Sequence, residues 1–395
     1  MCGAGTVGGG VCEMLSKYEN IHISHLFVRD ISKARDFALP MGCILTSRLD
    51  DIIEVIEDKG TDAVVELIGG TDKAWEIIQA CVRRGVHVVS GNKALISKHL
   101  VGLEKMIKSH SKPPFFLYEA AVCGGIPIIN TLLRGMKGDV INSIFGVVNG
   151  STNWMLDRMD RDGCTYDSLV SEAKALGYLE ADPSADIEGW DSRSKLCILS
   201  RLSFGIALNE NEVPCVGISA VTQKDVSLAR SHGRRIKLLA RSWVNDGVVH
   251  AFVFPAMVPQ DLTVANLPGA TNCISYQARF SGNHSMIGSG AGRFPTANSV
   301  VADILEIYGC MQRGCERAPD AFVECSGSPS FNADFTSRFY VRVSGNRERL
   351  ITGLQQRGIT NAFEDESSVI TEECSYATLC KVLDSVAYDA IMVFM

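Results

Sequence analysis

Four charged residues near the middle of the chain have types and spacing suited to proton transfer on an amino-acid substrate. Asp191 and Lys195 are four residues apart, so in a helix they lie on one face. A lysine beside a carboxylate could donate a proton while a carbonyl group is reduced. Glu180 and Asp186 lie just upstream and could hold the ammonium group of an amino acid. This segment predicts carbonyl reduction on a substrate of that class.

A second interpretation of the Asp191 and Lys195 pair stays open at this stage. Two residues four apart can form an exposed ion pair that contributes a few tenths of a kcal/mol, about 0.3–0.5. However, the helix continues after Lys195 as Leu-Cys-Ile-Leu-Ser, which is largely apolar and predicts burial. Burying a charge without a partner is costly, so a buried pair would need a functional reason.

Lys93 is another candidate for polarising a carbonyl group. Gly91-Asn92-Lys93 follows a predicted strand over 86–90 and precedes a predicted helix. In open α/β sheets, ligands bind beyond the carboxyl ends of the strands, which is where this tripeptide would lie. The alternative is a solvated surface lysine.

A glycine-rich hexapeptide lies at the start of the chain. Gly3-Ala4-Gly5-Thr6-Val7-Gly8 matches the pattern G-x-G-x-x-G, which lets the backbone approach a pyrophosphate at a helix N-terminus. A helix is expected from Val7 to Lys17. The motif normally follows a buried strand, and here Met1 and Cys2 alone precede it. We expect either a shortened first strand or a less well supported turn.

Arg29 bears on which dinucleotide would bind. It lies at the end of a predicted strand, about 20 residues beyond the glycine motif, and precedes Asp30. An acidic residue in this region usually binds the ribose hydroxyls of NAD, whereas an arginine accommodates the 2′-phosphate of NADP. Arg29 therefore favours NADP, unless the two residues form a solvated strand end.

Composition limits the class of protein. The 395 residues predict two or three domains, and 46% hydrophobic residues are enough for buried cores. No apolar run is long enough for a membrane span, and a net charge of −7 does not favour nucleic acid. The fourteen cysteines form no C-x-x-C pair, so we expect free thiols and a cytoplasmic location. With the motif beginning at Gly3, no signal or transit peptide is expected.

The predicted elements indicate an α/β fold with a Rossmann-type parallel sheet. Strands over 23–28, 62–68, 86–90 and 115–118 alternate with helices such as 72–84 and 99–110, which is typical of crossover connections. The expected domains are a nucleotide-binding domain (1–118 plus 286–310), an α+β substrate and dimerisation domain (119–285), a linker (311–337) and a C-terminal domain (338–395).

The second and last of these domains have different patterns. Helices are predicted over 153–160, 166–176 and 189–207. The last domain follows the order β-α-β-β-α-β, with strands at 338–344, 359–364, 368–372 and 389–394 and helices at 346–357 and 375–386. This order predicts a ferredoxin-like fold.

Several segments together resemble the homoserine dehydrogenase family. The most specific stretch is Gly146 to Leu156, which contains Asn149-Gly150-Ser151-Thr152. The resemblance covers about 3–305 and extends over 66–70, 88–93, 118–129, 172–178, 180–195 and 288–296.

The resemblance implies a specific reaction and specific residue roles. The family reduces L-aspartate 4-semialdehyde to L-homoserine with NAD(P)H, on the route to threonine, methionine and isoleucine. Lys195 would be the proton donor, Asp191 its partner, and Lys93 would lie beside the nicotinamide and the substrate. The implied substrate residues are Glu180, Asp186, Gly150 and Ser151. The implied cofactor residues are Gly3, Gly5, Thr6, Val7, Gly8, Arg29, Gly70, Lys93 and Gly292.

The resemblance also implies a monovalent cation and self-association. The cation, usually Na⁺, would lie at Glu119, Val122, Gly124 and Ile126. Family members pair through the central domain, so a homodimer or homotetramer is expected, with a small-molecule substrate and neither nucleic acid nor membrane as partner.

The sequence departs from the family pattern at a few positions. Gly91 replaces alanine, Ser151 replaces threonine, and Cys123 adds a side chain to the cation turn. The tail resembles an ACT domain in strand order but has Ser344-Gly-Asn-Arg-Glu in place of Asp-x-Pro-Gly. Amino-acid regulation and a purely dimerising role both remain open for it. Another NAD(P)-dependent dehydrogenase of amino-acid-like substrates, or an inactive ligand-binding homologue, are the alternative functions.

Overall fold

The structure is a computed structural model that describes residues 1–395 except 59, 315–328 and 346. The chain forms two compact units. The first unit comprises 1–140, 197–207 and 288–326, and the second comprises 141–196, 208–287 and 327–395. This division differs from the predicted one because the C-terminal strands belong to the second unit. Most of the predicted linker lies outside the described residues.

The first unit is built on a parallel sheet. Its strands are β1 (His25–Phe27), β2 (Ile44–Thr46), β3 (Ala63–Glu66), β4 (His87–Ser90) and β5 (Phe116–Leu117). β1 pairs with β2, and β3, β4 and β5 pair in sequence, all in parallel. Cys2 bridges Phe27 and Glu66 in parallel, so it joins the two groups. The resulting order is that of doubly wound dinucleotide-binding folds, which confirms the predicted fold class.

The short segment before Gly3 therefore occupies the strand position that the motif requires. The Cys2 N–H donates to Val65 O at 2.7 Å, and Cys2 O accepts from Leu67 N at 2.7 Å. On the other side, Phe27 N donates to Met1 O at 2.9 Å. The glycine turn is thus anchored to strands on both sides.

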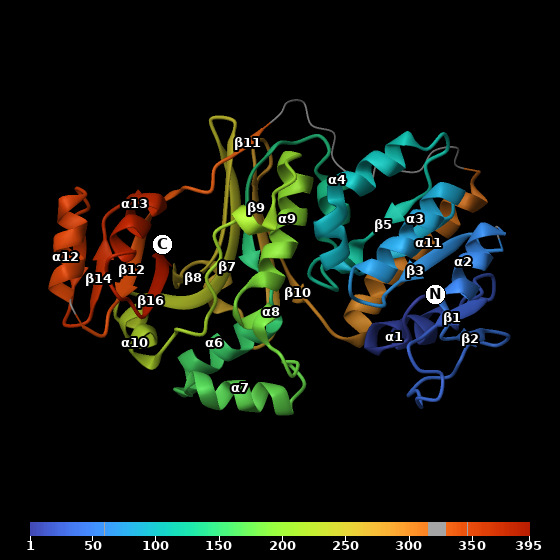
Figure 1. The fold of residues 1–395 in the computed structure, drawn as a ribbon, viewed down its shortest axis with the longest axis horizontal. Coiled ribbons are helices and arrows are strands. Elements are labelled where there is room, and N and C mark those ends of the chain that lie inside the picture. Colours follow the sequence, from blue (N-terminus) through green and yellow to red (C-terminus); the bar gives the residue numbers. More distant parts are fainter. Residues whose placement is uncertain (59, 315–328, 346) are drawn as a thin grey trace. The chain divides into compact units, whose positions relative to one another are not determined.

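Helices surround this sheet. They are α1 (Thr6–Leu15), α2 (Leu49–Glu57), α3 (Asp72–Arg84), α4 (Lys93–Ser109) and α11 (Arg293–Gln312). α11 packs on α1 although they are far apart in sequence (Figure 1). Gly10 permits this approach, since a Cβ there would lie 3.0 Å from Ala297 Cβ. After β5 the chain forms the short turns η1 (Glu119–Ala121), α5 (Ile128–Asn130) and η2 (Thr131–Gly135).

The second unit contains a large mixed sheet in the order β10-β9-β6-β7-β8-β16-β12-β14-β13. β7 and β8 form a hairpin of two twelve-residue strands. Asp246 and Gly247 both have positive φ at its turn, which is the geometry that a two-residue hairpin with this sequence favours. The strands are β6 (Ile141–Val147), β7 (Arg234–Asn245), β8 (Val248–Pro259), β9 (Thr271–Ala278), β10 (Gly282–Ser289), β11 (Ser330–Phe331), β12 (Thr336–Arg342), β13 (Asn361–Glu364), β14 (Ser368–Thr371), β15 (Cys374–Ser375) and β16 (Ala390–Phe394).

The C-terminal strands have the predicted ferredoxin-like arrangement. Across the sheet these four strands lie in the order β16-β12-β14-β13. Each pairing among the four is antiparallel. The crossing helices are α12 (Arg347–Gln356) and α13 (Tyr376–Leu383). β16 also pairs in parallel with β8, through Val393 with Ala256 and Phe394 with Met257. This pairing extends the central sheet into the tail, so the tail is not a separate compact unit.

The remaining helices of the second unit lie beside the central sheet. They are α6 (Gly150–Asp162), α7 (Tyr166–Ala175), α8 (Ser184–Ile187), α9 (Trp190–Phe204), η3 (Glu210–Glu212), α10 (Gln223–Ser231) and η4 (Thr263–Asn266). α9 belongs to this unit as far as Leu196. No helix among the described residues has the length and apolar character needed to cross a membrane. The cysteines of the described segments are all free thiols.

Candidate active site

Lys195 and Asp191 form the centre of a buried polar network at the start of α9. Lys195 Nζ donates to Asp191 Oδ2 at 2.7 Å and to Val148 O at 2.7 Å. Asn149 Nδ2 donates to Asp191 Oδ2 at 2.9 Å and to Asp186 Oδ1 at 2.5 Å. The network therefore joins three segments: the end of β6, α8 and the first turn of α9.

Burial decides between the two interpretations of this pair. Lys195 and Asp191 are each 7% exposed. An exposed helical ion pair is therefore the wrong interpretation. Buried charges persist when they are paired and hydrogen-bonded, and both conditions hold here. The arrangement holds an ammonium group in a fixed position with a carboxylate beside it, which suits a proton donor.

Local sequence explains how α6 and α9 begin at this place. Asn149 is the N-cap of α6, and its Oδ1 accepts the Thr152 N–H at 2.9 Å. Its amide nitrogen is then free to bind the two aspartates. Gly150 follows, and a Cβ there would lie 2.8 Å from Ala270 O. Gly189 has φ +80°, a conformation that favours glycine, and it turns the chain into α9.

The other predicted substrate residues lie on the same unit. Asp186 belongs to α8 and is part of the network through Asn149. Ser151 Oγ donates to Tyr178 O at 2.7 Å, so its hydroxyl links α6 to the segment after α7. Glu180 is exposed two residues further on, and no contact among the described residues joins it to the network. Its role remains a prediction.

The glycine turn on the first unit has the geometry of a pyrophosphate site. Gly3 has φ +107°, and a Cβ there would lie 2.5 Å from Leu67 O. A Cβ at Gly8 would overlap Gly3 O, so the helix packs tightly on the turn. Gly5, in contrast, has nothing within 4 Å of its Cβ direction. The backbone at Gly5 is therefore open to a ligand, while Gly3 and Gly8 serve the turn and its packing.

Thr6 and Val7 form the first turn of α1, directly after Gly5. The free N–H groups of this turn point at any anion placed there. Arg29 lies exposed just beyond β1. The neighbouring Asp30 carboxylate accepts the Ser32 N–H at 2.8 Å and the Ser32 hydroxyl at 2.7 Å. Asp30 is thus engaged in its own turn, while Arg29 lies exposed at this strand end and Lys33 lies exposed in the same loop.

A buried carboxylate organises the next two strand ends. Glu66 accepts the Ser90 hydroxyl at 2.8 Å and the Ile68 N–H at 3.0 Å, and burial raises the Glu66 pKa. Asn92 donates to Gly70 O at 2.7 Å and also caps α4. Lys93 is the first residue of α4 and is half-buried. Gly70 and Lys93 therefore lie together beyond the carboxyl ends of β3 and β4.

The turn after β5 contains the residues that were predicted to bind a cation, but the Glu119 side chain has a different role. The Glu119 carboxylate accepts the Ile129 and Asn130 N–H groups at 2.8 and 2.7 Å, and burial raises the Glu119 pKa. Its side chain therefore holds the start of α5, and cation binding here would depend on backbone carbonyls. Among the described residues, no cluster of three or more His, Cys, Asp or Glu side chains forms a metal site.

Cys123 and Gly124 give this turn its shape. Both have positive φ, at 53° and 47°, which is unusual for Cys123. A Cβ at Gly124 would lie 2.6 Å from Gly290 O, and Ser299 Oγ donates to Gly124 O at 2.7 Å. Val122 and Ile126 flank this pair. The segment before α11, including its N-cap Gly292 at φ +114°, thus returns to the cation turn.

The sequence analysis missed residues that hold these sites together. Asn149 was quoted within the α6 motif but was given no role, and Val148 contributes a backbone carbonyl, which no side-chain pattern reveals. Asn92 likewise joins Gly70 to Glu66. An asparagine directly before a predicted helix is a recognised N-cap signal, and it could have drawn attention to both asparagines.

Comparisons with known proteins agree with this geometry. The family model "Homoserine dehydrogenase, NAD binding domain" matches residues 3–112, and the family model "Homoserine dehydrogenase" matches 127–305. A homoserine dehydrogenase from Pseudomonas aeruginosa is 34% identical over 381 residues, covering 91% of this chain and 85% of the relative. One from Corynebacterium glutamicum is 36% identical over 319 residues, covering 77% and 70%.

Solved structures extend the likeness to the whole fold. The crystal structure of a homoserine dehydrogenase from Thiobacillus denitrificans has a TM-score of 0.90 at 30% identity and covers 100% of this chain and 97% of its own. A hyperthermophilic archaeal homoserine dehydrogenase in complex with NADPH has a TM-score of 0.64 at 27% identity, covering 78% and 96%. The chain belongs to the homoserine dehydrogenase family of NAD(P)-dependent oxidoreductases, which serve amino-acid biosynthesis.

Proposed function

We propose that Lys195 donates the proton when this enzyme reduces L-aspartate 4-semialdehyde to L-homoserine. The observation that carries this proposal is the buried network in which Lys195 Nζ lies 2.7 Å from both Asp191 Oδ2 and Val148 O. These two fixed acceptors hold the ammonium group of Lys195 in one position. A positioned ammonium group is what a general acid requires.

The chemistry needs a hydride at the aldehyde carbon and a proton at the aldehyde oxygen. NAD(P)H supplies the hydride when it is bound. Lys195 gives its proton to the oxygen as negative charge develops there, and Asp191 favours the charged form of the lysine beforehand. Asp186 and Glu180 would hold the ammonium group of the substrate, with Gly150 and Ser151 at the start of α6 completing the binding surface. Lys93 would add positive charge near the nicotinamide.

The cofactor proposal is NADP rather than NAD. Gly3, Gly5, Gly8 and the first turn of α1 suit a pyrophosphate, because Gly5 leaves the backbone open. The Asp30 carboxylate is occupied by Ser32, so it is poorly placed for a ribose hydroxyl. Arg29 would then bind the 2′-phosphate through charge-assisted hydrogen bonds.

A monovalent cation, Na⁺ in the family pattern, is proposed for the turn from Glu119 to Ile126. The support is a strained backbone at Cys123 and Gly124 that turns successive carbonyl groups. Hard cations take oxygen ligands, and main-chain carbonyls at Glu119, Val122, Gly124 and Ile126 would supply them. Cys123 carries a side chain where the family pattern has a glycine, so we expect the geometry of this turn to be slightly altered.

Self-association into a homodimer, or a tetramer built from it, is proposed through the second unit. β10 is the edge strand of the sheet in the described part of the chain. Ile287 on this strand is 54% exposed, and Phe280 in the turn before it is 74% exposed. An unpaired edge with exposed apolar side chains is suited to pairing with another chain.

The experiment that tests the reaction compares substrates and cofactors together. Oxidation of L-homoserine is measured against L-serine and L-threonine, with NADP and NAD, in the wild type and in Arg29→Ala. We expect strong preference for homoserine, because the site would be matched to its chain length. Arg29→Ala should raise KM for NADP by about 10–100-fold and leave KM for NAD close to that of the wild type, as expected for a lost charge-assisted contact.

Matched controls separate the possible results. Lys17→Ala removes an exposed cation at the far end of α1 and should change neither KM. Equal losses with both cofactors would exclude the role of Arg29. Faster turnover of L-serine or L-threonine would favour a different amino-acid dehydrogenase. Absence of turnover together with absence of NADPH binding by calorimetry would favour an inactive homologue.

A further inference from the structure

The loop that joins β1 to β2 carries Arg29 and covers residues 28–43 without a helix or a strand. Loops of this length without regular structure are uncommon in compact domains and usually have a function. Arg29 and Lys33 are both exposed on this loop, so their positions depend on what holds the loop in place. The residues that hold it therefore bear on the cofactor site.

Local contacts fix only the first part of the β1–β2 loop. The Asp30 carboxylate accepts the Ser32 N–H at 2.8 Å. Arg35 Nη2 donates to the Asp30 carbonyl at 2.9 Å, and Arg35 Nη1 donates to the Lys33 carbonyl at 2.6 Å. Donors and acceptors all belong to the loop itself, so these bonds give it a shape without attaching it to the rest of the unit.

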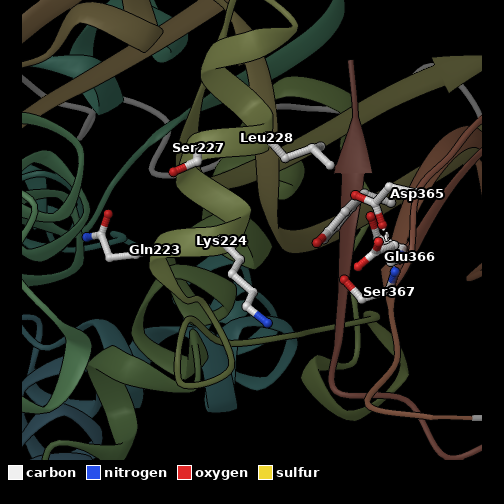
Figure 2. A pocket seen from close by; sticks show the side chains of 9 residues that line it. Gln223, Lys224, Ser227, Leu228, Asp365, Glu366 and Ser367 are labelled. Carbon is white, nitrogen blue, oxygen red and sulfur yellow. Dashed lines mark hydrogen bonds between the residues drawn. The ribbon is translucent and has the colours of Figure 1, made fainter.

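A loop of the second unit shows that a local turn can be sufficient for a short connection. Between β13 and β14, Asp365 Oδ1 accepts the Ser367 and Ser368 N–H groups at 2.8 and 2.6 Å. Figure 2 shows Asp365, Glu366 and Ser367 close together in this connection. The β1–β2 loop is much longer, so its later residues need an anchor outside the loop.

Arg293, the first residue of α11, provides such an anchor. Its Nη1 donates to the Asp36 carboxylate in the loop, and its Nη2 donates to the Glu13 carboxylate on α1. Among the described residues, the bond to Asp36 is the only ion pair between this loop and another element. Two exposed side chains that pair alone contribute little, but the Arg293 side chain is only 19% exposed and is shared by two carboxylates. A planar guanidinium held in this way has a fixed position.

Two consecutive glycines of α1 make room for this arginine. A Cβ at Gly9 would lie 3.0 Å from Arg293 Nη2 and 2.8 Å from Phe37 Cδ1, and a Cβ at Gly10 would lie 3.0 Å from Arg293 Cγ. Glycine is unfavourable inside a helix, so two in a row need a packing reason. They allow the Arg293 side chain and the loop residue Phe37 to lie directly against α1.

We propose that Arg293 is a positioning residue for the 2′-phosphate of NADP. It attaches the β1–β2 loop to α1 and so holds Arg29 and Lys33 in place for the phosphate. It also pairs with Asp36, whose carboxylate would otherwise repel a phosphate bound to the same loop. The link to the phosphate rests on the proposed function of Arg29, whereas the attachment of the loop does not.

Titration calorimetry on the full chain tests the link to the phosphate. The probes are 2′,5′-ADP, which carries the 2′-phosphate, and 5′-AMP, which lacks it, together with NADPH and NADH. Arg293→Met should weaken binding of 2′,5′-ADP and NADPH by about 5–20-fold, because the phosphate contacts are no longer preorganised and Asp36 has lost its counter-charge. Binding of 5′-AMP and NADH should stay close to that of the wild type.

Matched variants show whether the effect belongs to this arginine. The Arg84 guanidinium binds the Glu57 carboxylate and joins α3 to α2 in the same unit. Arg84 ends α3 shortly before β4 begins, at the opposite edge of the sheet from the glycine turn, so Arg84→Met should change none of the four affinities. Arg293→Lys can keep one of the two carboxylate contacts, and its affinity for NADPH should lie between those of the wild type and Arg293→Met.

Limited cleavage by trypsin tests the attachment of the loop without any cofactor. Arg29, Lys33 and Arg35 are trypsin sites within the loop. We expect the loop of Arg293→Met to be cut faster than that of the wild type by about fivefold or more, because a detached loop opens to the protease more often. Mass spectrometry identifies the sites, and thermal melting shows whether the fold is retained. Asp36→Asn, which removes the loop side of the pair, should give the same faster cleavage and serves if Arg293→Met does not fold.

The results separate the attachment from its consequence. Unchanged cleavage of the loop in Arg293→Met and Asp36→Asn would overturn the attachment. Faster cleavage with unchanged affinity for 2′,5′-ADP, or equal losses of affinity for 2′,5′-ADP and 5′-AMP, would overturn the link to the 2′-phosphate. Failure of the proposed function has a different signature, because Arg29→Ala would then bind 2′,5′-ADP as tightly as the wild type while the cleavage rates still report on the attachment.

Discussion

Two buried lysines of the second unit lie in different surroundings. Lys195 Nζ binds the Asp191 carboxylate and the Val148 carbonyl, both at 2.7 Å. Lys237, on β7, is 3% exposed, and its Nζ donates to Asn153 Oδ1 at 2.8 Å and Leu267 O at 3.0 Å. One lysine has a counter-charge in direct contact, and the other has neutral acceptors.

α6 connects the two regions through asparagines one turn apart. Asn149 binds the aspartates around Lys195, and Asn153 binds Lys237 together with the Gly269 carbonyl. Burial without a contacting carboxylate lowers the pKa of Lys237 to about 8. Burial alone therefore does not distinguish a reactive lysine from a structural one. We propose that the counter-charge and the neighbouring carboxylates mark Lys195 as the proton donor.

The largest expected effect comes from replacing Lys195, the proposed proton donor. Lys195→Ala should lower kcat by about 10²–10⁴-fold, the range for loss of a general acid. The fold should survive, as judged by circular dichroism and NADPH binding. Lys237→Met serves as the control and should keep kcat close to that of the wild type. Near-normal turnover in Lys195→Ala would remove the assigned role.

A smaller effect is expected at the asparagine that connects the aspartates. Asn149→Ala removes the donor shared by Asp186 and Asp191 and the N-cap of α6. The ammonium group stays present but is less well oriented, so kcat should fall by up to about 10²-fold, as for a misplaced catalytic group. The N-cap loss should also lower stability by about 1 kcal/mol. Asn153→Ala is the matched control and should mainly affect stability. If both variants lowered kcat equally, the functional difference between the two regions would be lost.

The smallest effect is a dependence of stability on pH that belongs to Lys237. Its folded pKa of about 8 lies below the ordinary unfolded value, so the folded state releases a proton that the unfolded chain still holds. Between these values the free energy of unfolding should rise with pH, by at most about 1.4 kcal/mol per pH unit from this group. Below pH 8 both states are protonated, and the contribution no longer changes.

Urea unfolding of the wild type and Lys237→Met measures this difference. The two free energies of unfolding are subtracted at about pH 7, 8 and 9, so that other titrating groups cancel. We expect the wild type to gain relative to the variant above pH 8. A constant difference across this range would mean that Lys237 keeps its proton and that its region resembles that of Lys195 more closely.

Features that depend on local spacing could be predicted from the sequence. The spacing of Gly3, Gly5 and Gly8 indicated a turn whose backbone approaches a phosphate, and the structure gives Gly3 and Gly8 a steric reason while it leaves the backbone at Gly5 open. The i,i+4 spacing of Asp191 and Lys195 predicted their contact. The order of elements in 338–395 predicted the ferredoxin-like arrangement. Each of these depends on residues close together in the chain.

Features that depend on distant residues could not be predicted in this way. A single bridging residue, Cys2, completes the parallel sheet because β1 and β3 both lie within reach of it. The Glu119 carboxylate is engaged by backbone groups ten and eleven residues later, which its family-based role as a cation ligand did not suggest. The β16 and β8 pairing joins the tail to the central sheet over more than 130 residues of chain.

The sequence by itself determined which residue types lie at which spacing along helices and turns, because those positions follow from backbone geometry. That was enough for the fold class and the glycine turn, and it made Lys195 a candidate for the proton donor. Tertiary structure alone decided which charges are buried and what each one contacts. The environment of an ionisable group is set by segments that come from elsewhere in the chain, and it is this environment that separates Lys195 from Lys237.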